Sequence, residues 1–213
     1  MIYLTTILSA VIGYLMGCIP IGVIVGRVFG HTDIRKKGSG STGTTNVLRT
    51  LGWVPSLLTF AGDCVKAVLG TLIGKWIGGE AGMLAAGLCA VLGHDFPVFM
   101  GFKGGKGIVA SLGATIVICP PVAPWLVVIV IATVAVVRIM SLGSMLASVS
   151  YPILFWFLMP EGTNRPLYMG FAVVMMLLSF FCHRGNISRL LKGEENKLDF
   201  NRISKLSGKL RKK

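Results

Sequence analysis

The residues best suited to chemistry lie in a glycine- and hydroxyl-rich stretch, residues 38–46, which Arg49 follows closely. Glycines let backbone N–H groups approach an anion closely and point at it together. Hydroxyls and an amide add further donors, and a guanidinium donates in the forked geometry that suits phosphate. The pattern therefore predicts a phosphate-binding segment, although a solvated loop between two helices is the alternative. The donors that we expect to contact substrate are Ser39, Thr45, Asn46 and Arg49.

A second candidate is the run at residues 102–107, where two lysines bracket a glycine pair just before an apolar segment. If a helix begins there, its unpaired N–H groups and its dipole favour an anion. Lysines beside a membrane span can also be simple topology anchors. The spacing favours a binding role, and the expected substrate contacts are Lys103, Gly104, Gly105 and Lys106.

Two further clusters follow expected spans. His183 precedes Asn186 by three residues, so both can project from one helical face into a pocket. The alternative is a basic helix that lies on anionic lipid. Ser141 and Ser144 stand at the start of another span, where capping that helix would explain both. His94 is expected to be a structural histidine.

The elements that must position these residues are membrane helices. Of the 213 residues 54% are hydrophobic and 14% are charged. Apolar runs of about twenty residues are candidate spans. We expect an all-α polytopic protein with one seven-helix domain, residues 1–182, and a basic segment, residues 183–213, that completes the site. The catalytic loops would be residues 30–52, 100–107 and 138–144. The expected spans are residues 2–28, 53–77, 81–99, 108–119, 122–137, 142–159 and 166–181.

Charge sets the expected orientation. The chain has 21 Lys and Arg against 8 Asp and Glu, a formal net charge of +13. Basic residues concentrate on the cytoplasmic side of membrane proteins. With seven spans, only Lys75 and Arg165 lie on the opposite side. The short run 108–119 could be re-entrant, but that would place the ten basic residues of the tail outside. We therefore predict an external N-terminus and a cytoplasmic C-terminus, and no nucleic-acid partner.

Several functional classes find no support in the pattern. The five cysteines lie in apolar segments without a C-x-x-C, which favours free thiols over a disulfide framework. No serine elbow and no cluster of metal ligands is present in the sequence, so we expect no metal and no cofactor. Asp63 and Lys66 are three residues apart in a span and are expected to pair with each other.

Three motifs together resemble those of one known family. The first combines Gly38, Ser39, Gly40, Gly43, Thr45, Asn46 and Arg49; the second combines His94, Phe96, Pro97, Val98 and Phe99 with residues 102–107; the third combines Asn186, Ile187, Arg189, Leu190, Gly193 and Glu195. They are similar to the motifs of the bacterial acyl-phosphate:glycerol-3-phosphate acyltransferases, integral inner-membrane enzymes of phospholipid synthesis. The likeness covers nearly the whole chain. Ser41 stands where that family usually has asparagine, and Gly185 where it usually has glutamate.

The resemblance implies a seven-helix fold and transfer of a fatty acyl group from acyl phosphate to the 1-hydroxyl of glycerol-3-phosphate. The products would be lysophosphatidic acid and phosphate. Acyl phosphate is already activated, so no protein nucleophile is needed, and either a substrate phosphate or His183 would take the proton. Catalytic roles then fall to His183, Asn186 and Lys106, and Ser144 joins the substrate contacts. The active site would face the cytoplasm at the inner membrane.

The expected partners are the two substrates and membrane lipid, with no obligate protein partner. A membrane transporter of a phosphorylated small molecule is the alternative function. The grouping of the anion binders at one membrane face, rather than at the midplane, weighs against it.

Overall fold

The computed structural model describes residues 1–210, and within this range it is helical without a strand. The expected all-α class is confirmed. Short 3₁₀ turns cover Ile34–Lys36, Val98–Met100 and Pro120–Val122. The helices are α1 (Ile2–Gly17), α2 (Ile21–Gly30), α3 (Thr44–Leu51), α4 (Trp53–Asp95), α5 (Ile108–Ile118), α6 (Ala123–Val137), α7 (Met140–Leu158), α8 (Arg165–Cys182), α9 (Arg184–Leu191) and α10 (Phe200–Leu210).

Helix α4 consists of two arms that fold back on each other at Gly79. Gly79 has φ +61° and ψ −142°, a conformation that a residue with a side chain rarely adopts. The two arms pack closely, because a Cβ added at Gly74 would lie 2.6 Å from the carbonyl oxygen of Gly82. The sequence predicted a turn between two spans at this point. The structure confirms the reversal.

The first expected span is interrupted near Pro20. Helix α1 ends at Gly17 and α2 begins at Ile21, since proline has no N–H with which to continue the helix. Helix α1 packs against α4 through small residues. A Cβ at Gly13 would meet the Ala86 carbonyl oxygen at 2.3 Å, so only glycine allows this approach. Residues 2–28 are therefore two helical segments and not one continuous helix.

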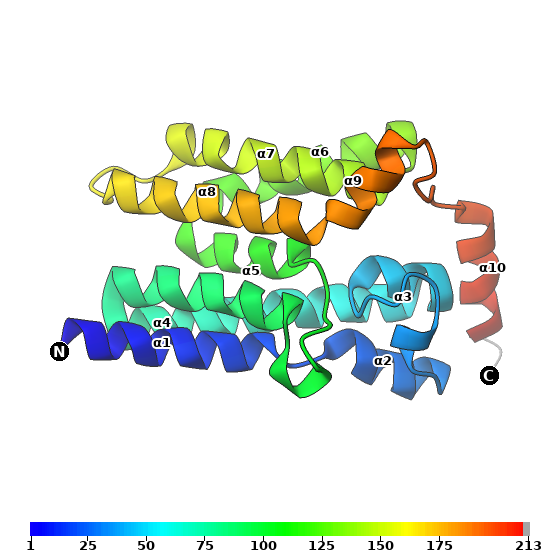
Figure 1. Cartoon of the computed structure of the whole chain (residues 1–213), viewed down its shortest axis with the longest axis horizontal. Helices are drawn as coiled ribbons and strands as arrows, with labels where there is room; N and C mark the ends of the chain where they lie inside the picture. Colours follow the sequence, from blue (N-terminus) through cyan, green and yellow to red (C-terminus); the bar gives the residue numbers. More distant parts are fainter. Residues whose placement is uncertain (211–213) are drawn as a thin grey trace.

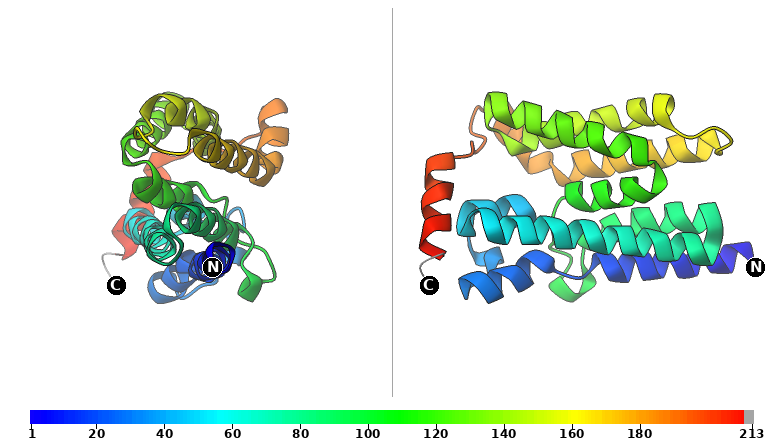
Figure 2. Two further views of the ribbon diagram at one scale, coloured as in Figure 1. Left: turned by 90° about the vertical axis from the view of Figure 1, so that its left-hand side faces the viewer. Right: turned by 180° about the vertical axis from the view of Figure 1, so that it is seen from behind.

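The molecule has two helical layers with α5 between them (Figure 1). Helices α1 to α4 form one layer, α6 to α8 form the other, and the further views show the same division (Figure 2). The large apolar core lies where α4, α5, α6, α7 and α8 meet. Five helical segments of the described chain are long and apolar enough to cross a membrane, counting α1 with α2 as one and both arms of α4 as one, whereas α5 has only 11 residues. The count of seven spans remains a prediction.

The segment expected to be a loop, residues 30–52, contains a helix. Helix α3 buries Val47, Leu48 and Leu51 on one face, which gives it a reason to fold despite its polar first turn. Gly52 ends it with φ +87°. The prediction of a loop throughout this region was wrong because burial of these apolar residues outweighs the weak helix propensity of Thr44, Thr45 and Asn46.

The basic tail forms α9, a connecting stretch and α10; residues 211–213 of the expected segment lie outside the described residues. We call residues 194–207 the strap, because they join the ends of both layers. Leu198 N–H donates to the Arg138 carbonyl at 2.7 Å beside α7. Phe200 stacks on Trp53 at the start of α4, with ring centroids 6.3 Å apart. The strap therefore crosses the end of the cleft between the layers.

Candidate active site

A cavity of about 770 Å³ lies between the two layers. Its polar end is bordered by α3, the turn before α5, the start of α7, and α9 with the strap. From there an apolar arm extends between α5, α6, α7 and α8. Polar residues on its wall include Ser39, Thr45, Arg49, Lys106, His183 and Asn186; apolar ones include Leu112, Leu126, Val130, Ala147 and Met175.

Lys106, Asn186 and Glu195 form a buried network at the polar end. Lys106 Nζ donates to Asn186 Oδ1, and Asn186 Nδ2 donates to Glu195 Oε1 at 2.7 Å. Glu195 also accepts from Ser141 Oγ at 3.0 Å and from Arg189 Nε at 2.8 Å. Burial works to raise the pKa of Glu195, but these hydrogen bonds outweigh it and hold the pKa below its usual value. Glu195 is thus an ionised anchor for its neighbours.

Two cationic side chains retain donors toward the cavity. Burial lowers the pKa of Lys106 and that of Arg49, with the charge of Glu195 opposing both shifts. Arg49 Nη2 donates to the Asn196 carbonyl in the strap at 3.0 Å. Its Nε is buried and has no hydrogen-bond partner among the residues that the structure describes, and the same holds for Thr44 Oγ1. A buried donor without a partner favours an anionic or polar ligand at this place.

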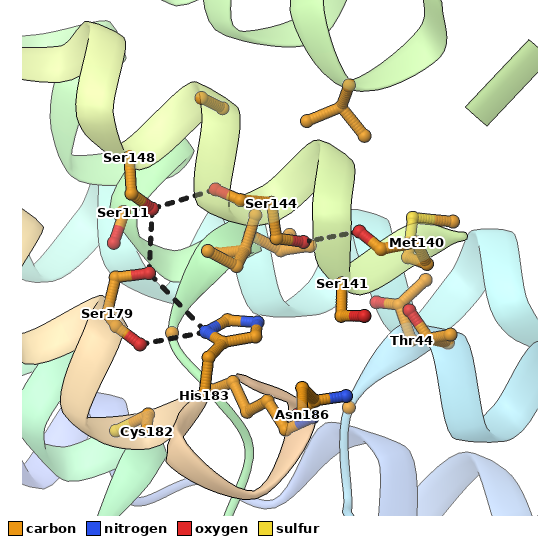
Figure 3. Close-up of a pocket in the computed structure, with 18 of the residues that line it drawn as sticks. Thr44, Ser111, Met140, Ser141, Ser144, Ser148, Ser179, Cys182, His183 and Asn186 are labelled. Atoms are coloured by element: carbon orange, nitrogen blue, oxygen red, sulfur yellow. Dashed lines mark hydrogen bonds between the residues drawn. The ribbon is translucent and has the colours of Figure 1, made fainter. Parts of the chain in front are cut away.

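His183 lies between α8 and α9 with its ring in the cavity wall (Figure 3). Its Nδ1 lies 2.8 Å from the Ser179 carbonyl oxygen, which can only accept, so Nδ1 carries the proton and Nε2 is the basic nitrogen. The side chain is 2% exposed. Burial lowers the pKa of His183 to about 4, and the charge of Lys106 acts in the same direction. The ring is therefore neutral at physiological pH and can accept a proton.

A family model described as glycerol-3-phosphate acyltransferase matches residues 7–193. The chain belongs to this family. The glycerol-3-phosphate acyltransferase of Thermoanaerobacter sp. (strain X514) is 39% identical over 195 residues, which cover 90% of this chain and 95% of that protein. That of Synechococcus sp. (strain JA-2-3B'a(2-13)) is 41% identical over 196 residues, covering 92% and 96%.

Solved structures agree with this assignment. The crystal structure of PlsY (YgiH), an integral membrane glycerol 3-phosphate acyltransferase, in its glycerol 3-phosphate form, matches with a TM-score of 0.82 at 32% identity. The match covers 93% of this chain and 98% of that one. The lysophosphatidic acid form of the same protein matches with a TM-score of 0.81. The protein described here is thus an integral membrane acyltransferase of phospholipid biosynthesis.

Most predicted site residues of the acyltransferase meet at the cavity. Ser39, Thr45, Arg49, Lys106, Ser144, His183 and Asn186 all border it. Asn46 also borders the cavity, but its side-chain amide forms hydrogen bonds with backbone groups of the glycine-rich segment and of the residues just before it. Its Oδ1 accepts from the Ser39 N–H at 2.8 Å, and its Nδ2 donates to the carbonyls of Ile34, Lys37 and Ser41. Asn46 therefore holds the glycine-rich segment in shape.

Lys103, Gly104 and Gly105 do not border the cavity. Lys103 is exposed, and the N–H groups of Gly104 and Gly105 donate to the carbonyls of Asp95 and His94 at 3.1 and 3.0 Å. A Cβ at Gly105 would lie 1.9 Å from His94 Nε2. The two glycines allow the turn to lie against α4, and this contact places Lys106.

The structure excludes the capping alternative for two serines and adds cavity residues to which the sequence analysis gave no individual role. Ser141 and Ser144 do not cap α7, because Ile139 occupies that position without a side-chain hydrogen bond. Ser141 binds Glu195, and Ser144 donates to the Met140 carbonyl at 3.0 Å. The cavity wall also includes Ser41, Thr44, Arg184, Arg189, Glu195 and Asn196. An acidic residue such as Glu195 within a strongly basic segment was the available signal.

Asp63 and Lys66 in α4 pair with each other, as predicted. Lys66 Nζ lies 2.8 Å from Asp63 Oδ1 and donates to the Ile19 carbonyl at 2.7 Å. His94 Nδ1 lies 3.3 Å from the same Asp63 oxygen. The cluster links the two arms of α4 to the break between α1 and α2, and it supports the turn that carries Lys106. Asp63 and His94 also border the cavity, so a purely structural role for His94 stays a prediction.

Proposed function

We propose that this acyltransferase moves a fatty acyl group from acyl phosphate to the 1-hydroxyl of glycerol-3-phosphate, releasing lysophosphatidic acid and inorganic phosphate. One observation carries the proposal: a single cavity joins a cationic polar end, containing a neutral histidine, to an apolar arm. The related PlsY structures are described as glycerol 3-phosphate and lysophosphatidic acid forms, which supports the same acceptor and product here.

The polar end suits two substrates that both carry phosphate. Arg49 offers an unpaired Nε donor, and Lys106 lies beside Asn186 on the same wall. Charge-assisted hydrogen bonds of this kind are the strong ones for phosphate oxygens. With both phosphates bound, the acceptor hydroxyl can be aligned with the carbonyl carbon of the donor.

The chemical step needs one proton acceptor and no protein nucleophile. The hydroxyl oxygen of glycerol-3-phosphate bonds to the carbonyl carbon while the bond from that carbon to the phosphate oxygen breaks. The hydroxyl proton passes to His183 Nε2 or to a phosphate oxygen of a substrate. Lys106 stabilises negative charge that develops on the reacting oxygens. Asn186 holds Lys106 in place.

The proposed topology has seven crossings, with an external N-terminus and the polar end of the cavity at the cytoplasmic face of the inner membrane. The two arms of α4 count as two crossings, and α5 crosses within the protein between the layers. The polar end lies at the same end of the bundle as α3, α9 and α10 (Figure 1). Clustering of basic residues at that end supports this orientation.

Purified protein supplied with palmitoyl phosphate and glycerol-3-phosphate tests the proposal. We expect lysophosphatidic acid and phosphate in equal amounts, with palmitoyl-CoA as sole donor giving far less product. Chelator should leave the rate unchanged, because arginine and lysine supply the positive charge. Equal turnover with palmitoyl-CoA, or a rate that requires added magnesium, would contradict the proposal.

A further inference from the structure

The apolar arm of the cavity is closed at its deep end. The last side chain of each surrounding helix that borders the cavity is Leu112 on α5, Leu126 on α6, Tyr151 on α7 and Met175 on α8. The next residues inward are buried and do not border it, among them Thr115, Val122 and Phe155. The arm therefore has a floor, made of these four side chains.

Tyr151 is held in this floor by a hydrogen bond and by aromatic packing. Its hydroxyl lies 2.6 Å from Thr115 Oγ1, and its ring packs on Phe155 with centroids 4.7 Å apart. Phe171 packs against the same ring at 6.4 Å. Tyr151 is 4% exposed, so it cannot swing into lipid without breaking these contacts. A substrate chain that reaches the floor meets a fixed wall.

The depth of the arm is set by the helix that lines it. Ser144 borders the polar end and Tyr151 the floor, seven residues later on α7. At about 1.5 Å per residue this is about 10 Å of apolar wall below the polar end. The hydroxyls of Ser144, Ser148 and Ser179 along the way are paired with protein atoms, so they leave no unpaired donor facing an alkyl chain.

We propose that Tyr151 limits the length of the acyl chain that the enzyme transfers, because the chain descends the arm and its end meets the Tyr151 ring. The inference rests on the proposed function only in placing the acyl chain in this cavity. An additional methylene in a tight apolar pocket changes discrimination by about tenfold or more. Removing the ring should therefore admit longer chains, and filling the arm above it should exclude them.

Two variants change the arm in opposite directions. Tyr151→Leu removes the ring but keeps apolar bulk, and Thr115 Oγ1 still donates to the Ser111 carbonyl at 2.6 Å. Ala147→Leu adds volume one helical turn nearer the polar end, where Ala147 borders the cavity. Phe157→Leu is the matched control, because Phe157 lies on the same helix but is exposed and does not border the cavity. Each is assayed for kcat/KM with hexanoyl, octanoyl, decanoyl, lauroyl, myristoyl, palmitoyl and stearoyl phosphate.

We expect the longest efficient chain to increase in Tyr151→Leu and to decrease in Ala147→Leu, each relative to the wild type. The ratio of kcat/KM between neighbouring chain lengths at the limit should change by about tenfold. Phe157→Leu should keep the wild-type limit. The same chain-length profile in all four proteins would overturn the proposal and indicate that the alkyl chain leaves sideways into lipid.

The test separates this inference from the proposed donor. If the wild type uses acyl-CoA and not acyl phosphate, the proposed donor is wrong. The chain-length dependence of kcat/KM is then measured with acyl-CoA molecules of the same chain lengths. Thermal stabilisation by lysophosphatidic acids of the same chain lengths measures the limit on chain length without requiring turnover. A stabilisation profile that Tyr151→Leu and Ala147→Leu leave unchanged would contradict the role of Tyr151 even where turnover is lost.

Discussion

The Nζ of Lys106 donates a hydrogen bond to Oδ1 of Asn186, which joins the turn before α5 to α9 over 80 residues of sequence. The carboxylate of Glu195 fixes the orientation of that amide, because it can only accept from Asn186 Nδ2. Asn186 must therefore present its oxygen to Lys106. The ammonium group is held at the polar end of the cavity before any substrate arrives.

Replacing Lys106 with methionine should lower kcat/KM by about thirty- to a thousand-fold, because a desolvated phosphate loses a charge-assisted partner worth about 2–4 kcal/mol. Lys103→Met is the matched control, since Lys103 is exposed and does not border the cavity. Steady-state kinetics on folded, purified protein checks both. Equal losses in the two variants would mean that Lys103 contacts substrate as well.

Arg49→Lys should be nearly as damaging as loss of the charge. The guanidinium group of Arg49 donates to the Asn196 carbonyl through Nη2 and, among the described residues, leaves Nε free to donate to a substrate. Lysine has no such forked group and cannot make both contacts. We expect kcat/KM to fall by at least about tenfold, while Arg27→Lys, at an exposed position, stays at the wild-type rate. Near-normal activity in Arg49→Lys would reduce this residue to a topology anchor.

The low pKa of His183 predicts the acid limb of the pH profile. With a pKa near 4 the ring stays neutral down to about pH 5, so kcat should hold its plateau there. An inflection near pH 6.5 would contradict a buried neutral base. The profile is measured for kcat at saturating substrate, because kcat/KM would also reflect the ionisation of free glycerol-3-phosphate near about pH 6.

The same shift affects stability with a definite sign. The unfolded chain takes up a proton on this histidine below about pH 6.5, whereas the folded chain does so only near pH 4. Stability should therefore fall as the pH decreases through that window. A His183→Gln variant should lose this part of the pH dependence in thermal unfolding.

The strap should contribute to both stability and substrate binding. Phe200→Ala removes the stack on Trp53 and part of the apolar contact with α3, at a cost of about 1–2 kcal/mol. We expect a lower Tm and a higher KM for glycerol-3-phosphate, because the strap carries the Asn196 carbonyl that holds Arg49. Asn201→Ala, exposed on the same helix, is the control and should change neither quantity.

Topology can be tested with single cysteines in a background that lacks the five native ones. Lys205→Cys on α10 should be shielded from impermeant thiol reagents in intact cells. Glu161→Cys, in the connection between α7 and α8, should react, because seven crossings place it outside. Labelling of position 205 alone would reverse the orientation, and labelling of neither would remove one of the crossings.

Hydropathy predicted most of the helices, because burial in lipid leaves a signal in runs of apolar residues. The reversal at Gly79 and the short α5 were both visible in this way. Helix α3 was missed because its apolar residues make sense only once the strap and α2 cover them. Local sequence cannot show which distant segment will cover an amphipathic face.

The site residues were predicted better than their contacts. Arg49, Lys106 and His183 could be found from residue type and spacing, but the partner of each depends on how the layers dock. Arg49 meets Asn196 across 147 residues of sequence. Lys103 was placed in the site by its likeness to Lys106, and only the fold of the turn against His94 separates the two.

The strap also sets an order of events during biosynthesis. It leaves the ribosome after α8, so both layers can enter the membrane before Glu195 and Asn196 exist to join them. Arg49 and Asn186 would until then lack these partners. We therefore expect a chain that ends after α9 to be inserted but inactive, and active enzyme to form only when the strap docks.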